Sequence, residues 1–134
     1  MTASPLSRYQ EVDVLTMHPA QRVVFLYTQV LASLHQARAL YAAGQREEWG
    51  KRLLRAQDIV NELYVSLDFE QGGQIAASLA ALYDYWLREL TALSIRHDDA
   101  RHTRLVGLVG EMHGAWAKAA AEVMSAPSTV AQSA

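Results

Sequence analysis

The residue types that could do chemistry are concentrated in the stretch RHDDARH, which places His97, Asp98, Asp99 and His102 close together. Imidazole and carboxylate side chains are common ligands of transition metals. However, the chain contains neither an HExxH motif nor the Glu-x-x-His pair of di-iron bundles. The stretch also spans a predicted helix start, where Asp98 or Asp99 can accept the free backbone N–H groups of the first turn. We therefore predict a capping role for the aspartates and no metal site.

Acid–base and nucleophilic chemistry have equally little support in the sequence. Asp68, Glu70 and Asp84 have no histidine or lysine partner nearby in the chain, and there is no cysteine and no G-x-S-x-G motif. The glycine pair Gly72–Gly73 is not followed by Lys-Ser/Thr, as a phosphate-binding loop would require. The sequence thus predicts a protein that is not an enzyme and needs no cofactor.

Length and charge narrow the class of protein further. The chain has 134 residues, a net charge of −2 and a pI near 6.2. One domain is expected at this length, and nucleic-acid binding would need a basic stripe that the composition does not offer. The N-terminus lacks the pattern of a secretory signal, and no apolar run approaches the roughly 18 residues of a membrane span. We expect a cytoplasmic protein with no membrane insertion.

The elements that must position any site are helical. All three prolines lie outside residues 20–126, and the interior is rich in Ala, Leu, Gln, Glu and Arg. Apolar residues recur three and four apart, which predicts an all-α, antiparallel up-and-down four-helix bundle. The expected parts are a mobile N-terminal cap segment (1–18), a bundle (19–123) and a flexible tail (124–134). Its helices are expected at 19–44, at 46–66, from the glycine pair to 96, and from about 99 to 123.

Each helix has one apolar stripe for the core, and the glycine pair is expected to form the turn before the third helix. The four stripes are Val23, Leu26, Tyr27, Val30, Leu34, Ala37 and Tyr41; Trp49, Leu53, Ala56, Val60, Leu63 and Leu67; Ile75, Leu79, Leu82, Trp86, Leu90 and Leu93; and Leu105, Leu108, Val109, Met112, Trp116, Ala119 and Val123.

Apolar residues remain outside these stripes: Val24, Phe25 and Leu31, then Leu54 and Val65, then Ala76, Ala80, Tyr83 and Leu87. A helix needs only one apolar face to join a bundle, so a second face requires a cover. Neighbouring helices or the N-terminal segment could supply it, with Tyr9, Val12 and Leu15 as the cap. The alternative is a partner-binding groove for an amphipathic helix.

The fourth helix also has a line of small residues away from its core stripe: Thr103, Gly107, Gly110, Gly114, Ala117 and Ala121. Each glycine costs roughly 1 kcal/mol relative to alanine in a helix. The line is either a solvent-facing feature or a surface for self-association.

One stretch is similar to the signature of a known family. SLDFEQGGQIAASLAALYDYW (66–86) resembles the Ser-Leu-Asp, Gly-Gly and Leu-Tyr-Asp-Tyr pattern of the flagellin export chaperones of the FliS family. RAQDIVNELYVSLD, VVFLY and the helix end at Gly44 extend the resemblance over residues 9–120. The chain departs from the family at TMHP (16–19), where Thr-Ala-Ser-Pro is usual, and at LYTQ (26–29), where Leu-Tyr-Asp-Gly is usual.

The resemblance implies a cytoplasmic chaperone that binds the disordered C-terminal region of flagellin. Such a chaperone prevents premature polymerisation and delivers flagellin to the flagellar type III export apparatus, whose gate components are further candidate partners. We expect the residues outside the core stripes to contact the client. The competing hypothesis is a homo-oligomeric structural or regulatory protein of the flagellar system with a different client.

Overall fold

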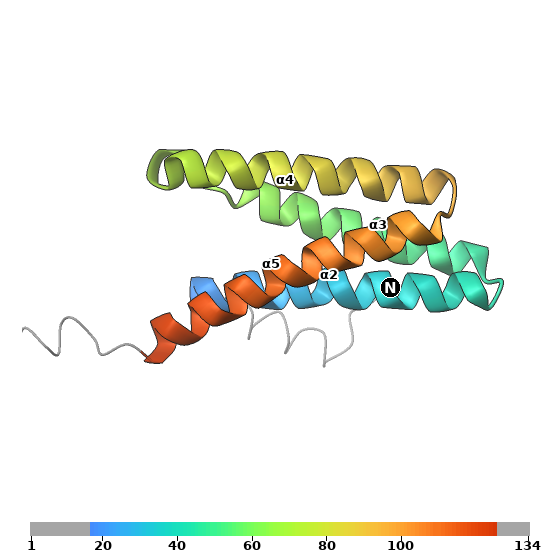
Figure 1. The fold of residues 1–134 in the computed structure, drawn as a ribbon, viewed down its shortest axis with the longest axis horizontal. Helices are drawn as coiled ribbons and strands as arrows, with labels where there is room; N and C mark the ends of the chain where they lie inside the picture. Colours follow the sequence, from blue (N-terminus) through green and yellow to red (C-terminus); the bar gives the residue numbers. More distant parts are fainter. Residues whose placement is uncertain (1–16, 126–134) are drawn as a thin grey trace, which may run out of the picture.

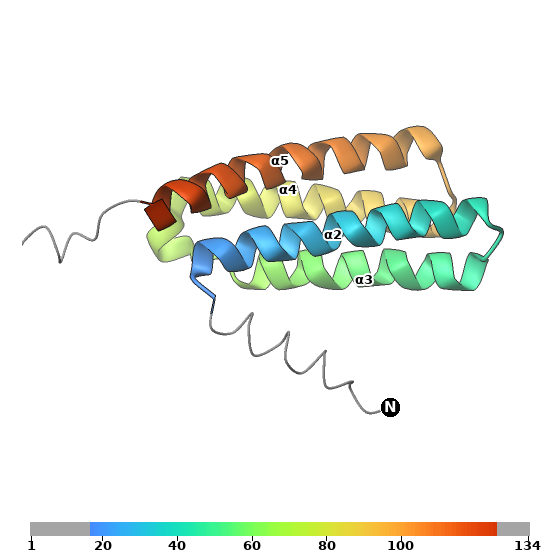
Figure 2. The ribbon, with the colours of Figure 1, turned by 90° about the horizontal axis from the view of Figure 1, so that it is seen from below.

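Four α-helices make up nearly all of residues 17–125, the part of the chain that the computed structural model describes. They are α2 (Pro19–Ala42), α3 (Arg46–Val65), α4 (Phe69–Ile95) and α5 (Asp99–Ser125). Consecutive helices run in opposite directions and are joined by short connections (Figure 1, Figure 2). The predicted antiparallel up-and-down four-helix bundle is therefore confirmed.

The first helix begins and ends where the sequence predicts. Pro19 occupies the first helical turn, where its missing N–H group costs nothing. Gly44 follows the C-cap with a φ of 77°, a conformation that glycine adopts without strain. The Gly44 N–H donates to the Tyr41 carbonyl at 3.0 Å and the Gln45 N–H donates to the Leu40 carbonyl at 2.9 Å. These two bonds satisfy carbonyls that the helix end would otherwise leave free.

The glycine pair interrupts the first turns of α4. The helix is assigned from Phe69, but Gly73 has non-helical backbone angles and separates the turn at residues 69–72 from the rest of the helix. The expected break of the chain at the glycines is therefore confirmed, although helical structure begins before them. Asp68 caps the helix by accepting two backbone N–H bonds of 3.1 Å. Gly73 has φ 50° and ψ −121°, which kinks the first turns of the helix. A Cβ on Gly72 would lie 2.8 Å from the Ala76 Cβ, so this position also favours glycine.

The core is centred on two aromatic residues, Tyr27 of α2 and Trp86 of α4, each 0% exposed. Their rings meet edge to face with centroids 5.7 Å apart. The prediction that Trp86 belongs to the core is thus confirmed. The other predicted stripe residues that are buried are Leu26, Val30, Leu34, Ala37, Leu53, Ala56, Val60, Leu63, Leu90, Leu93, Leu105 and Val109.

Two parts of the predicted core pattern are wrong. Ile75 and Val123, assigned to core stripes, are 72% and 50% exposed, and Ala119 is also exposed. Conversely, the line Ala76, Ala80 and Tyr83 is buried. These residues therefore face the interior of the bundle, where the Tyr83 hydroxyl lies 2.9 Å from the Tyr27 hydroxyl of α2.

The four helices do not enclose the core evenly. Helix α2 packs extensively against both α3 and α5, and α3 packs against α4, whereas α4 and α5 touch only sparingly. In Figure 1, α4 and α5 lie close together at their connection and separate toward the opposite end. One of the four seams of the bundle is therefore open over part of its length.

Candidate functional site

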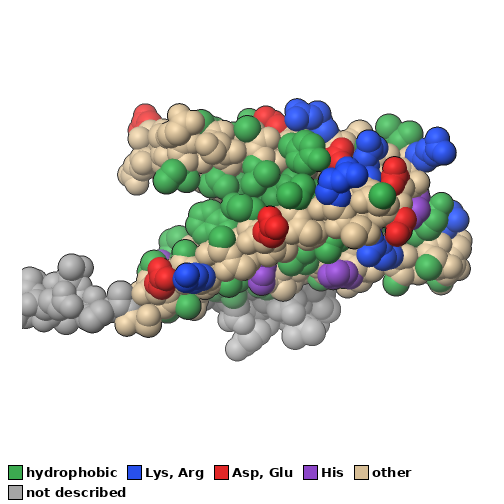
Figure 3. All heavy atoms as spheres, viewed as in Figure 1, with side chains coloured by type: hydrophobic (Ala, Val, Ile, Leu, Met, Phe, Trp, Pro, Cys, Tyr) green, Lys and Arg blue, Asp and Glu red, His purple; other side chains and the backbone are tan. Residues whose placement is uncertain are grey.

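An apolar groove occupies the open part of the seam between α4 and α5. Its cavity has a volume of about 260 Å³. Ile75 and Leu79 of α4 and Trp116 of α5 form its walls, and Val23 and Leu63 from the other two helices contribute to its lining. Figure 3 shows hydrophobic side chains lining the hollow between the two helices. A cleft of this kind accepts apolar side chains of a partner.

A pair of tyrosine hydroxyls lies beneath this groove. The Tyr27 and Tyr83 hydroxyl oxygens are 2.9 Å apart, and Tyr83 also lines the groove. Burial raises the pKa of both phenols above its ordinary value, so both are protonated at neutral pH. The Trp116 ring lies near Tyr27, with centroids 6.4 Å apart. The groove thus combines apolar walls with a neutral polar cluster.

A second hollow lies between the start of α2 and the end of α5. Its volume is about 330 Å³, and Val24 and Phe25 of α2 face Ala117 and Ala120 of α5 across it. The remaining lining residues are Met17 and Gln21. This hollow borders the point where the described part of the chain begins, and its walls are also mainly apolar.

The nine predicted partner-binding residues fall into three groups. Tyr83 and Ala76 line the groove, and Val24 and Phe25 line the second hollow. On α3, Leu54 is 56% and Val65 is 82% exposed. The remaining three lie at neither cavity: Ala80 is buried, and Leu31 and Leu87 are half-buried against the core.

The predicted N-terminal cap of Tyr9, Val12 and Leu15 lies outside the described residues.

The groove walls are not recognisable as a binding surface from the sequence. Ile75, Leu79 and Trp116 have the spacing of core residues, which assigns them to core stripes. They border a groove because α5 diverges from α4, a property of the angle between two helices. Heptad-like spacing contains no signal for that angle, although the excess of apolar residues over one stripe per helix does indicate an uncovered surface.

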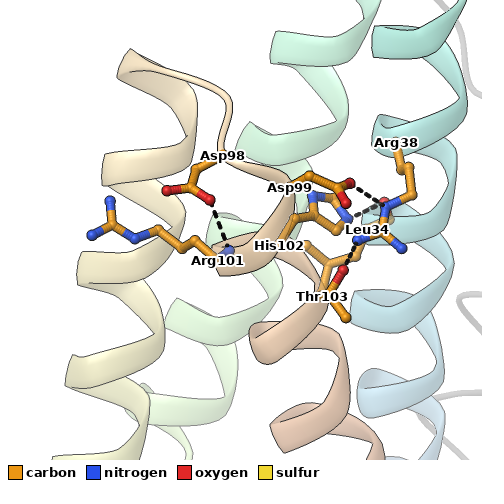
Figure 4. A network of polar contacts seen from close by, with 7 residues as sticks. All are labelled: Leu34, Arg38, Asp98, Asp99, Arg101, His102 and Thr103. Carbon is orange, nitrogen blue, oxygen red and sulfur yellow. Dashed lines mark hydrogen bonds and ion pairs between the residues drawn. The ribbon is translucent and has the colours of Figure 1, made fainter.

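At the opposite end of the bundle, polar contacts link the start of α5 to α2 (Figure 4). Asp98 accepts a 3.0 Å hydrogen bond from the Arg101 backbone N–H, which confirms its predicted capping role. Arg38 of α2 reaches α5 twice, with its Nε 3.6 Å from an Asp99 carboxylate oxygen and its Nη2 2.6 Å from the Thr103 hydroxyl. These contacts bind the start of α5 to α2.

His102 is the buried member of this network. It is 0% exposed, and its Nε2 lies 2.9 Å from the Leu34 carbonyl oxygen, which can only accept. Nε2 therefore carries the proton, and Nδ1 is buried without a partner among the described residues. Burial, followed by the nearby Arg38 charge, lowers the pKa of His102 below its usual value, so the ring is neutral.

Residues 17–125 contain no group of three or more His, Cys, Asp or Glu side chains that could hold a metal ion. Within the same range, no helix combines the length and the apolar character needed to cross a membrane. The candidate binding sites of the described residues are therefore the two apolar cavities.

Comparison with known proteins assigns the family. Residues 2–123 match the family model described as flagellar protein FliS. A flagellar secretion chaperone FliS of Salmonella typhimurium is 32% identical, over 86% of this chain and 89% of the relative. Bacillus subtilis has a protein of the same name that is 28% identical, over 87% of this chain and 86% of the relative. For the flagellar secretion chaperone FliSB of Pseudomonas aeruginosa the values are 27%, 83% and 91%. The chain therefore belongs to the FliS family of flagellar secretion chaperones.

Proposed function

We propose that this protein is a cytoplasmic export chaperone that binds the disordered C-terminal region of flagellin. In this proposal the bound region cannot polymerise prematurely, and the complex delivers flagellin to the flagellar type III export apparatus. The observation that carries the proposal is an open apolar groove between α4 and α5 in a member of a family of secretion chaperones. Relatives that bear the name flagellar secretion chaperone support the choice of a secreted flagellar client.

The groove suits a client that folds as it binds. A disordered segment loses conformational entropy when it orders, and burial of its apolar side chains must offset that loss. Half-buried Leu79 and Trp116 and exposed Ile75 supply the receiving surface on a bundle that is already folded. An amphipathic helix of the client would complete the open seam, and its apolar face would no longer be available to other flagellin subunits.

The predicted partner-binding residues fit this proposal at three places. Ala76 and Tyr83 would contact the client at the groove, and Val24 and Phe25 would contact it at the second hollow. The exposed Leu54 and Val65 would extend the contact over α3. A client that reaches all three surfaces would have to wrap around the bundle.

The N-terminal cap remains part of the proposal. Tyr9, Val12 and Leu15 would cover a client surface until the client displaces them. Removal of residues 1–16 should then tighten binding, because the client no longer competes with a segment of the chaperone. An unchanged or weaker affinity of the truncated protein would contradict the cap.

The proposal is tested by calorimetric titration with the C-terminal region of the flagellin encoded in the same genome. Leu79→Glu should weaken binding at least tenfold, because a carboxylate would be buried against the client's apolar face. Ala81→Glu is the matched control on the exposed side of the same helix and should bind like the wild type. Circular dichroism verifies that both variants fold. No binding by the wild type would contradict the proposed client, and equal binding by all three proteins would exclude the groove.

A further inference from the structure

The polar cluster beneath the groove has more hydrogen-bond donors than it uses. Each phenol of Tyr27 and Tyr83 has one O–H, and the Trp116 indole has one N–H, whereas the acceptors within these three side chains are the two phenol oxygens. One hydrogen bond of 2.9 Å joins the two phenols and uses one of these three donors. The Trp116 N–H reaches no acceptor with full hydrogen-bond geometry among the described residues, and makes at most a weak contact that slightly lowers the pKa of Tyr27. The cluster is therefore rich in donors.

Unused donors in this position are costly. Tyr27 is 0% and Tyr83 is 2% exposed, and the Trp116 Nε1 is also buried. A buried donor without an acceptor loses its hydrogen bond to water and gains nothing in return. An acceptor that arrives through the groove would remove this cost, and both Tyr83 and Trp116 line the groove.

We propose that Tyr83 and Trp116 select the client by donating hydrogen bonds to a neutral acceptor on the segment that fills the groove. This inference rests on the proposed function, because it assumes that the client binds there. The client residue would be Asn, Gln, Ser or Thr within an otherwise apolar helix face.

An acidic acceptor is disfavoured at this site. A buried carboxylate would lose its hydration among the apolar walls. Asp68, which also lines the groove, adds repulsion between like charges. A purely apolar client face is disfavoured as well, because it would supply no acceptor for the unused donors. The cluster therefore discriminates between helices of similar hydrophobicity.

The tyrosine pair provides its own control. Tyr83→Phe removes the hydroxyl that borders the groove, whereas Tyr27→Phe removes its partner on α2 and leaves the Tyr83 hydroxyl free to donate. Titration with the C-terminal region of flagellin should show roughly tenfold weaker binding for Tyr83→Phe, the usual effect of an acceptor left unpaired. Tyr27→Phe should stay within about twofold of the wild type, and so should Tyr85→Phe, the matched control on the same helix.

A purely structural role of the pair predicts a different pattern. Both Tyr27→Phe and Tyr83→Phe would then lower the melting temperature and change the affinity by similar factors, which would overturn the inference. A Tyr83→Phe variant that binds like the wild type would also overturn it. If the wild type does not bind, the proposed function itself fails. If the wild type binds, the comparison of the three variants decides the role of the donors alone.

The client side offers an independent measurement. Each Asn, Gln, Ser and Thr of the client segment is replaced in turn by an apolar residue of similar size. One replacement should weaken binding to the wild type roughly tenfold and have little further effect on Tyr83→Phe, because the two groups form one interaction. Fully additive losses at every position would contradict a hydrogen bond to Tyr83.

Discussion

The two ends of the α4–α5 seam differ in the side chains that line them: one end has ion pairs and hydrogen bonds, and the other has apolar side chains. At the closed end, Arg101 of α5 pairs with Glu89 of α4 at 3.5 Å, and His102 is hydrogen-bonded to the α2 backbone. At the open end, the two helices present Ile75, Leu79 and Trp116 to a groove. All four ion pairs of residues 17–125 lie in the half of the bundle that contains the α2–α3 and α4–α5 connections.

This difference indicates a division between the two ends of the bundle, in which the closed end stabilises the fold and the open end is available for binding. Ion pairs and buried side chains such as Leu93 hold the closed end together without a partner. The open end keeps apolar surface available: Ile75 is 72% exposed, whereas Leu79 and Trp116 are partly buried against the core. One end thus supplies stability and the other supplies accessible apolar surface. Four predictions test the division, from the largest expected effect to the smallest.

Truncation of one leucine or isoleucine at each end should separate stability from binding. Leu93→Ala removes a side chain that is 1% exposed near the closed end and should cost about 2–5 kcal/mol of unfolding free energy. Ile75→Ala changes a side chain that is 72% exposed and should cost less than about 0.5 kcal/mol. Urea unfolding measures both, and similar losses at the two ends would contradict the division.

Glycine substitutions should have opposite signs at the two positions where the structure makes different demands. Gly73→Ala forces a side chain into φ 50° and ψ −121° and should destabilise the protein by about 1–3 kcal/mol. Gly114→Ala meets no atom within 4 Å in a regular helix and should stabilise it by about 0.5–1 kcal/mol. Thermal unfolding of both variants provides the measurement. A stabilising Gly73→Ala would mean that the kink of α4 is absent.

Acidification should weaken the closed end through His102. Its folded-state pKa is lowered from about 6.5, mainly by burial, so the unfolded chain takes up this proton first as the pH falls. Stability should therefore decrease from pH 6.5 downward, by at most about 1.4 kcal/mol per pH unit from this group. His102→Gln retains a neutral donor for the Leu34 carbonyl and should flatten the slope in this window. An unchanged slope would assign the pH dependence to other groups.

The ion pair across the closed seam should have the smallest effect. Arg101 is partly exposed and Glu89 is mostly buried, with side-chain exposures of 38% and 15%. A double-mutant cycle with Arg101→Ala and Glu89→Ala should give a coupling of about 0.2–1 kcal/mol that decreases with added salt. No measurable coupling would leave apolar packing as the main link at this end.

The sequence predicts the bundle more completely than it predicts the groove. Residues such as Leu34, Leu53 and Leu90 are buried as their spacing indicates, because one apolar stripe per helix is a local property. The Gly44 helix end also follows from local chemistry, since a glycine after an apolar-periodic segment favours the left-handed conformation.

The features that the sequence does not predict depend mainly on how the helices pack against one another. Ala76 and Ala80 look like a second face that needs a cover, and both are buried within the bundle, where α4 packs against α3. Ile75 looks like a core residue and is exposed because α5 turns away from α4. The glycine pair looks like a loop, yet Asp68 caps a helix before it. The first two outcomes are decided by contacts between distant segments, whereas the third is a local capping contact made by Asp68.

The three tryptophans provide the most direct measurement of the central claim, that the client occupies the open end of the α4–α5 seam. Trp116 lines the groove, Trp86 lies in the core and Trp49 packs against Tyr41 beside the α2–α3 connection. Each indole N–H gives its own NMR signal during titration with the C-terminal region of flagellin. The account predicts a large shift for Trp116 and an unchanged signal for Trp49. A shift of Trp49 with Trp116 unchanged would place the client at the closed end and contradict the account.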